Sequence, residues 1–409
     1  MKQTRTVKTA MVVLLGFFVL NATAQDPTIT DVSVRQRWPW SRLVDIDYVL
    51  SCETTNRMDV TLTAYNSATP LTLADESLSG DTRFGISQGA HRIVWDPLKS
   101  NYTNDILTRF HVTLTVTNSP LYMIVDLTNL VAGSSAHVEY IYPGDTQLVT
   151  VGRWTNVWFG VTNDTQYKTD KLVLRRIPAG TFMAGPEEKT QSRVTLTRDF
   201  YVSVFEVTAG QWYRITGSGS LTTSAKGSVT YNDLRGATND SPRVDWPSTG
   251  HSVKPSSFIG QLRDKTGISG FDLPTEAQWE YMSRAGTTTH FNDGIAGSST
   301  NQLNELGWWF HNRLGGSPHV VGLKTANFWG LYDTLGNVFE WCLDWSATPL
   351  PAGDDPVGPT SSGSGKRIPP HGGCYYSQVG DCRSSVREVP YLPDHPAGHF
   401  GCRVVIQLP

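Results

Sequence analysis

The sequence predicts a chain of two domains, an all-β sandwich followed by a loop-rich domain that mixes short helices with strands. The chain has 409 residues, and a single hydrophobic core rarely grows beyond about 250–300 residues. Short runs that alternate apolar and polar residues fill its first third, which is the pattern of half-buried strands. The 37 Gly and 23 Pro residues favour turns and loops over long helices.

Residues 1–24 have the pattern of a secretory signal. Lys2, Arg5 and Lys8 precede an apolar run, and Ala22-Thr23-Ala24 offers a small-residue cleavage site. The apolar run is too short to span a bilayer comfortably, and no later run approaches spanning length. We expect cleavage, no transmembrane segment in the mature protein, and a bacterial protein exported to the periplasm, the cell surface or the medium.

Residues 26–118 are expected to form the sandwich, of immunoglobulin or fibronectin III type. Four alternating runs are separated by turn residues; they cover 44–50, 60–65, 92–95 and 111–116. Cys52 is the single cysteine of this module, so the immunoglobulin disulfide is absent. Asp45 and Asp47 share one strand face, which we interpret as exposed to solvent. We expect a spacer or an adhesive module without catalytic residues.

Residues 119–169 are expected to connect the two domains and to pack against the second, which spans 170–409. Within it, a helix should begin at Thr208 as N-cap, a second should lie in 251–267, and a third should follow Thr275. The net charge is −3 and no Lys or Arg run occurs. The composition therefore points neither to nucleic acid nor to an anionic membrane surface.

Three phrases of the second domain occur in an order that is specific. They are LPTEAQWEY at 273–281, GLYDTLGNVFEW at 330–341 and HGG at 371–373. Together they resemble the formylglycine-generating enzyme, or sulfatase-modifying factor, family, and the resemblance covers about 171–405. It implies an α+β fold related to C-type lectins, with little regular secondary structure and much buried loop.

The resemblance implies a structural calcium ion in the second phrase. Its ligands would be the side chains of Asp333 and Glu340 and the backbone carbonyls of Gly336 and Val338, an all-oxygen set of the kind that Ca²⁺ prefers. The other interpretation is that Asp333 caps a turn and Glu340 makes an ion pair. The sequence leaves both open.

Formylglycine-generating enzymes oxidise a sulfatase cysteine with oxygen and copper, and two cysteines hold the copper. Those cysteines stand three and eight positions after the serine of the GGS phrase. Here the phrase ends in Cys374, the third position is Ser377 and the eighth is Cys382. One thiolate is therefore missing, and a hydroxyl does not replace it on a soft Cu(I) ion. Either Cys374 turns inward to pair with Cys382, or no oxidase chemistry remains.

The resemblance also suggests two disulfides. Cys374 and Cys402 replace other residues of the family phrases, so a Cys374–Cys402 bond is one hypothesis, with Cys342–Cys382 as a second and Cys52 left single. The family's branch that uses a three-histidine iron site does not fit, because the first domain is β. His395 and His399 lie in a segment whose Pro and Gly residues oppose the helix that would align their rings.

Variable proteins of diversity-generating retroelements resemble this family and bind ligands with the interval between the third phrase and the closing one. In this chain the corresponding residues are Tyr375, Tyr376, Asp381, Tyr391, His395, His399 and Phe400. The sequence thus leaves two functions open. One is an exported binding or scaffold protein at the cell envelope that recognises a protein, peptide or glycan. The other is a copper oxidase in which Cys382 acts, with Ser377 and Cys374 lining its pocket.

Overall fold

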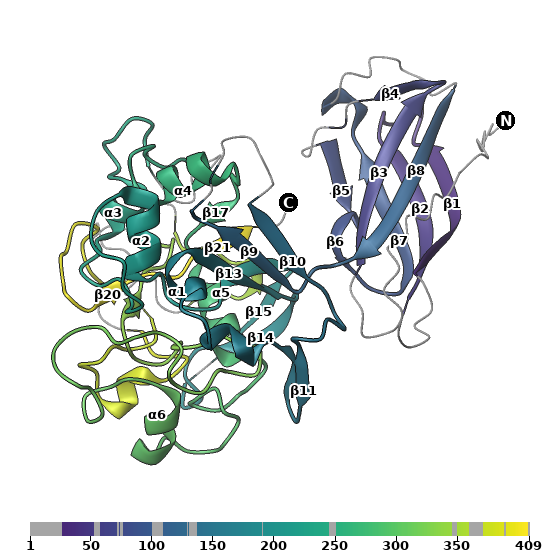
Figure 1. Cartoon of the computed structure of the whole chain (residues 1–409). Helices are drawn as coiled ribbons and strands as arrows, with labels where there is room; N and C mark the ends of the chain where they lie inside the picture. The colour runs from purple at the N-terminus through teal and green to yellow at the C-terminus, as the bar shows by residue number, and fades with distance from the viewer. Residues whose placement is uncertain are drawn as a thin grey trace. The chain divides into compact units, whose positions relative to one another are not determined.

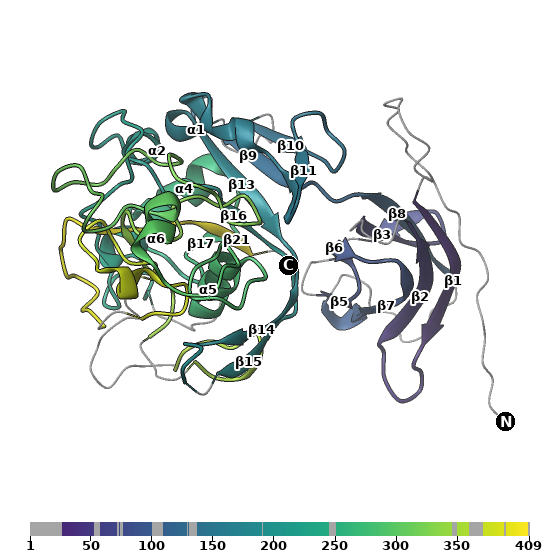
Figure 2. The same ribbon diagram turned by 90° about the horizontal axis from the view of Figure 1, so that it is seen from below.

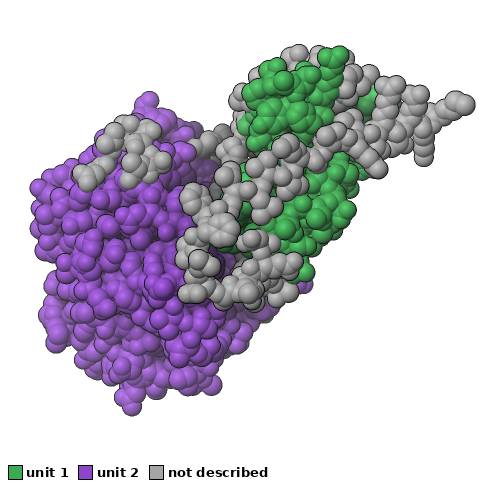
Figure 3. Space-filling model, turned by 45° about the vertical axis from the view of Figure 1, so that its right-hand side comes forward, with its two compact units in different colours: residues 1–119, 409 green, residues 120–408 purple. Residues whose placement is uncertain are grey.

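The computed structural model describes residues 27–407 except 53–57, 72, 74–76, 100–108, 129, 131–136, 190, 245–250, 346–349, 360–370 and 388–389. The expected signal, 1–24, lies outside this range. The chain divides into two compact units, Met1–Ser119 and Pro120–Leu408, which Figure 3 colours separately. None of the helices in the described ranges combines the length and the apolar character needed to cross a bilayer.

The first unit consists of two antiparallel sheets. One has the order β1-β2-β7-β5, and in the other β3 pairs with β4, β6 and β8. The strands are β1 (Thr28–Gln36), β2 (Val44–Ser51), β3 (Met58–Asn66), β4 (Thr69–Leu71), β5 (Leu78–Gly80), β6 (Arg83–Ile86), β7 (Gly89–Trp95) and β8 (Phe110–Asn118), with the short 3₁₀ helix η2 (Pro97–Lys99) after β7. The four runs that the alternation predicted fall in β2, β3, β7 and β8.

Both sheets of the first unit contribute to one hydrophobic core. Ile46 and Trp95 of the first sheet belong to the same buried cluster as Val60 and Leu114 of the second. The alternation of the sequence therefore places one side of each strand in this core, as a period of two requires. The all-β prediction for this part of the chain is confirmed.

Asp45 and Asp47 differ in burial, contrary to the prediction of one exposed face. Asp47 pairs with Arg92 at the surface. Asp45 is buried, because the guanidinium groups of Arg35 and Arg37 contact its two carboxylate oxygens at 3.0 and 2.7 Å. The exposed interpretation is wrong for Asp45, since long arginine side chains can cover a short acidic one.

The second unit is built around a six-stranded sheet of order β10-β9-β13-β16-β21-β17. Its strands are β9 (Tyr122–Asp126), β10 (Val138–Ile141), β13 (Lys171–Ile177), β16 (Phe200–Ser203), β17 (Phe271–Asp272) and β21 (Val405–Gln407). Figure 1 shows β10, β9 and β13 side by side. The first two come from 119–169, the segment expected to connect the domains.

Smaller sheets and short helices complete the second unit (Figures 1 and 2). The further strands are β11 (Val149–Val151) with β12 (Trp154–Val157), β14 (Gly180–Ala184) with β15 (Ser192–Leu196) and β19 (Gly353–Asp354), and β18 (Phe339–Glu340) with β20 (Phe400–Gly401). The helices are α1 (Gln166–Thr169), α2 (Ala209–Thr216), α3 (Tyr231–Arg235), α4 (Phe258–Thr266), α5 (Glu276–Arg284) and α6 (Thr300–Leu306), with 3₁₀ helices η3 (Phe159–Thr162) and η4 (Val379–Cys382).

The predicted helix starts are confirmed by their caps. The Thr208 hydroxyl accepts a hydrogen bond from the backbone N–H of Gln211 at the start of α2. Thr275 does the same with Gln278 at the start of α5, and both caps are reciprocal capping boxes. The helix expected in 251–267 is shorter and begins after Ser257, which caps α4.

Much of the chain after α6 is loop, and much of that loop is buried. Buried backbone groups must find partners, and here side chains supply them. The Asn327 amide donates to the carbonyl oxygens of Met282 and Ser283, and its oxygen accepts from the N–H groups of Trp329 and Leu331. Polar side chains thus replace the ladders of regular structure.

Candidate functional site

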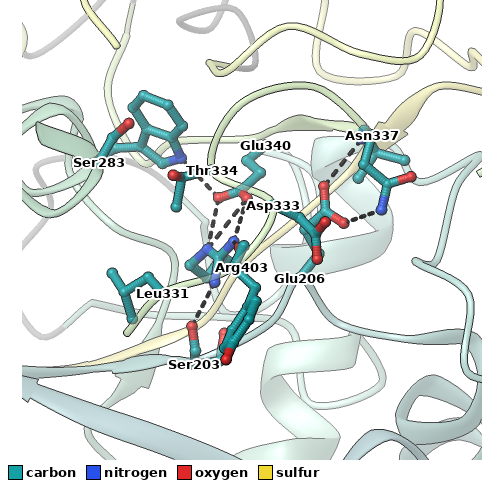
Figure 4. Close-up of polar contacts among 12 residues, drawn as sticks. Ser203, Glu206, Ser283, Leu331, Asp333, Thr334, Asn337, Glu340 and Arg403 are labelled. Carbon is teal, nitrogen blue, oxygen red and sulfur yellow. Dashed lines mark hydrogen bonds and ion pairs between the residues drawn. The ribbon is translucent and has the colours of Figure 1, made fainter. Parts of the chain in front are cut away.

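Arg403 is the centre of a buried polar network in the second unit (Figure 4). It donates to the carbonyl oxygens of Ser203, Val204 and Tyr332 at 2.7, 2.9 and 2.7 Å. It also pairs with the Glu340 carboxylate at 3.0 Å, which in addition accepts a hydrogen bond of 2.7 Å from the Trp279 indole. One guanidinium therefore ties β16, β18 and the 330–341 phrase together.

Two further carboxyl groups lie in this network. Glu206 accepts hydrogen bonds from the Asn337 side-chain amide and from the backbone N–H of Val338, at 2.5 and 3.0 Å (Figure 4). The Asp333 carboxylate accepts one from the backbone N–H of Gly322 at 2.6 Å. Burial raises the pKa of Asp333 to about 6. Burial, with the charges of Asp333 and Glu340 nearby, raises the pKa of Glu206 well above its ordinary value.

The residues expected to hold calcium are all in this region. Asp333 takes a left-handed conformation with φ of 56°, as does Gly336 with φ of 86°, so the phrase turns tightly. Asp333 Oδ1 is buried without a hydrogen-bond partner among the described residues. Glu340 makes the ion pair that the second interpretation expected. Asp333 Oδ1 thus offers one buried oxygen of the kind that Ca²⁺ prefers, whereas the Glu340 carboxylate is already engaged by Arg403 and Trp279.

The structure brings Cys374, Ser377 and Cys382 together, although they are eight positions apart. Cys374 Sγ lies 3.5 Å from Ser377 Oγ, and the Ser377 hydroxyl accepts a hydrogen bond from the backbone N–H of Cys374. Cys382 Sγ lies against Gly373. Cys382 is fully buried, and this burial, followed by the charge of Cys374, raises the pKa of its thiol well above the ordinary value.

The two disulfides suggested by the sequence are not formed. No disulfide joins any of the five cysteines in the structure. Cys342 packs in the core that contains Trp279 and Met282, whereas Cys382 packs in a different cluster with Leu303 and Leu335. The hypothesis of a Cys342–Cys382 disulfide is therefore wrong, because the two side chains pack into separate cores.

The residues of the predicted ligand surface differ in exposure. Tyr376 is 43% exposed, but Tyr375 is only 2% exposed and Phe400 is fully buried. Tyr375 instead donates a hydrogen bond to the Gly316 carbonyl oxygen, and Phe400 packs edge-on against Trp341. Tyr375 and Phe400 were predicted to contact a ligand, but both are buried and pack beneath the surface instead.

Aromatic and histidine rings form the part of that surface that faces solvent. Tyr391 stacks on His395 at a centroid distance of 4.7 Å, and Tyr376 meets His399 edge-on at 6.2 Å. The segment from Tyr391 to His399 is loop and turn rather than helix, as its prolines predicted. Asp381 lies apart from these rings, in η4, where it accepts a hydrogen bond from the backbone N–H of Gln378.

A cavity of about 230 Å³ lies beside this aromatic surface. It is lined by Tyr231, Asn232, Gly236, Ala237, Thr238, Leu392, Pro393 and Asp394. The backbone N–H of Asn232 donates to the Pro393 carbonyl oxygen at 3.0 Å, which joins the two walls. The sequence did not predict that residues of α3 and of the segment after it, between 231 and 238, line this cavity. No local signal marks α3 as a neighbour of a loop more than a hundred residues later.

The fold and its network define an α+β domain in which buried polar side chains hold long loops around a short-stranded sheet. Residues 160–408 match the family model described as the sulfatase-modifying factor enzyme 1-like domain. The chain therefore belongs to the formylglycine-generating enzyme, or sulfatase-modifying factor, family, as the phrases of its sequence predicted.

Curated relatives cover different shares of the chain. The chaperone protein LppX of Paenibacillus barcinonensis is 26% identical over 224 residues, which are 44% of this chain and 74% of that protein. The formylglycine-generating enzyme of Streptomyces coelicolor is 34% identical over 151 residues, which are 33% of this chain and 46% of the enzyme. The chain thus spans less than half the length of that enzyme.

Two solved structures show a partial likeness to the chain. Treponema denticola variable protein 1 is 24% identical with a TM-score of 0.45, and the alignment covers 58% of this chain and 95% of that one. PvdO from Pseudomonas aeruginosa is 20% identical with a TM-score of 0.46, with the same coverage.

Proposed function

We propose that this chain is an exported binding protein of the family, and that it acts at the cell envelope. Its ligand surface would consist of Tyr376, Tyr391, His395 and His399 with the adjoining cavity. The observation that supports this proposal most directly is that the stacked, partly exposed rings of Tyr391 and His395 border a cavity of about 230 Å³. The first unit would serve as a spacer or adhesive module of immunoglobulin or fibronectin III class.

The state of the thiol site supports binding over oxidation. A cysteine reacts as the thiolate, and burial in apolar surroundings suppresses that form. Cys382 is fully buried with a raised thiol pKa, and Ser377 stands where the family has its other copper-binding cysteine. A relative whose name is that of a chaperone also supports a role in binding.

Among protein, peptide and glycan ligands, we propose a glycan. The cavity is lined by Asn232, Thr238 and Asp394, whose side chains can donate to and accept from hydroxyl groups. The stacked rings of Tyr391 and His395 supply the flat apolar face against which a sugar ring can lie. A small cavity that carries several polar side chains beside an aromatic face is therefore suited to one sugar unit and its neighbour.

Removing the aromatic face should weaken binding. Once a glycan array has identified a ligand, Tyr391→Ala and Asp394→Ala are each expected to reduce its affinity about tenfold or more, because each removes a central contact. Isothermal titration calorimetry measures the change. Tyr140→Ala, at a partly exposed tyrosine of β10, is the matched control and should bind as wild type. Unchanged affinity in both surface variants would exclude this site.

A copper oxidase is the second candidate function, and the orientation of Cys374 favours it. Cys374 Sγ lies beside Ser377 Oγ, so Cys374 and Cys382 could together supply the two thiolates that hold copper, which would bind oxygen. The first test is a Cu(I) titration of the reduced protein against a competing chelator. A one-to-one complex lost in Cys374→Ser and in Cys382→Ser, but kept in Ser377→Ala, is the expected result for an oxidase. Absence of binding would remove this candidate.

Calcium is expected to stabilise the second unit through Asp333, Glu340 and the carbonyls of Gly336 and Val338. Glu340 would then share its carboxylate between the ion and Arg403. A ligand present at about 100 times its Kd stabilises the native state by about 2.7 kcal/mol. Urea titrations with calcium and with a chelator measure the gain.

Asp333→Asn is the matched variant for the calcium prediction, because asparagine tolerates the left-handed backbone at this position. It should abolish the gain, whereas Asp354→Asn, at an exposed residue of β19, should keep it. An unfolding midpoint that calcium does not move in the wild-type protein would rule out this site.

A further inference from the structure

The connection between β1 and β2 is a closed hairpin tip. The backbone N–H of Arg37 donates to the Leu43 carbonyl oxygen at 2.9 Å, and the N–H groups of Trp40 and Ser41 donate to the Arg37 carbonyl oxygen at 3.1 and 3.2 Å. Leu43 N–H donates to the Ser41 hydroxyl. These bonds fix the backbone of the segment.

Two indole rings project from this tip. Trp40 is 91% exposed and Trp38 is 44% exposed, with the exposed Pro39 between them. Tryptophan is normally among the most buried residues by area. Adjacent exposed tryptophans at a hairpin tip indicate a contact surface, because exposed apolar groups of this size cost free energy in water.

The same tip carries an excess of positive charge. Arg35, Arg37 and Arg42 flank the tryptophans. The first two share the single carboxylate of Asp45, at 3.0 and 2.7 Å. Two guanidinium groups therefore share one carboxylate, which leaves a surplus of positive charge at the tip of a chain whose net charge is −3. The tip is positive although the protein as a whole is negative.

We propose that the hairpin tip, residues 37–43, docks on the interface of an anionic lipid bilayer, with Trp38 and Trp40 among the headgroups. Tryptophan is enriched at that depth because its ring is apolar and its N–H can still hydrogen-bond. Arginine residues next to the surface are attracted to anionic phosphate groups. Two signals together, an apolar anchor and basic residues, are what stable surface binding requires.

A glycan fits this tip less well than a lipid headgroup. Sugar recognition needs acceptors as well as donors for hydroxyl groups. The acidic side chain at the tip, Asp45, is buried and already binds two guanidinium groups, so the charged groups left at the surface are donors. The average composition gave no indication of a membrane partner, because the strand pairing of β1 with β2 concentrates the arginines.

The test is co-sedimentation of the full chain with vesicles of phosphatidylglycerol and phosphatidylcholine, and with phosphatidylcholine alone. We expect binding to the anionic vesicles that falls about tenfold or more in Trp40→Ala and weakens with added salt. Because Trp40 is exposed, this variant should fold normally. Leu98→Ala, at a residue of the same unit that is 66% exposed, is the control and should bind as wild type.

A second readout locates the ring in the bilayer. Brominated phosphatidylglycerol should quench part of the tryptophan fluorescence of the wild-type protein, and Trp40→Phe should reduce that quenched part, leaving the share of Trp38, while keeping most of the binding. Equal vesicle binding by wild type and Trp40→Ala would overturn the proposal. So would Trp40-dependent binding to soluble glycans without binding to vesicles.

Discussion

Replacing Arg403 with methionine should destabilise the second unit by about 3–5 kcal/mol, because it leaves buried charge without its partner. Arg403 pairs with Glu340 and donates to three carbonyl oxygens of the buried loops. Methionine fills similar space but donates no hydrogen bond. The carboxylate and the carbonyl groups would then remain desolvated and unpaired, which costs more than the lost contacts.

Urea titration of the full chain, followed by tryptophan fluorescence, measures the loss of stability that Arg403→Met causes. Arg198→Met, at an exposed arginine of the same unit, is the control and should change the midpoint little. The double variant Arg403→Met with Glu340→Gln should recover part of the loss, because the uncompensated charge is gone. If Arg403→Met has the same urea midpoint as Arg198→Met, the network does not stabilise the loops.

The second large effect should come from Glu276 and should depend on pH. Glu276 is buried at the start of α5, and burial raises its pKa to about 7 although the Arg387 guanidinium contacts it. A carboxyl group with a raised pKa in the folded protein binds protons more tightly there than in the unfolded chain. Its stabilisation is therefore complete below about pH 4.5 and is lost as the pH rises through 7.

Glu276→Gln should remove this part of the pH dependence. The difference in unfolding free energy between wild type and Glu276→Gln should shift by about 3 kcal/mol, against the wild type, from pH 4.5 to pH 8. Urea titrations at several pH values measure it. Glu139→Gln, at an exposed residue of β10, should track the wild type throughout. A constant difference between wild type and Glu276→Gln would show that Glu276 ionises normally.

Several features of this protein were predictable from the sequence because each depends on residues close together along the chain. Strand alternation located β2, β3, β7 and β8, since a strand shows its buried face every second residue. Thr208 and Thr275 marked the starts of two helices, because an N-cap bonds to a backbone group three residues later. The phrases at 273–281 and 330–341 identified the family.

Other features depend on which distant residues meet, and these required the tertiary structure. Asp45 is buried because two arginines fold over it, and Tyr375 is buried although the next residue, Tyr376, is exposed. The cavity joins Asn232 to Pro393, and Arg403 reaches Ser203 across about two hundred residues of chain. Capping hydrogen bonds and strand periodicity act locally, so short segments of the sequence contain them. Burial and long-range contacts arise only when distant segments pack together within each unit, so no single segment contains them.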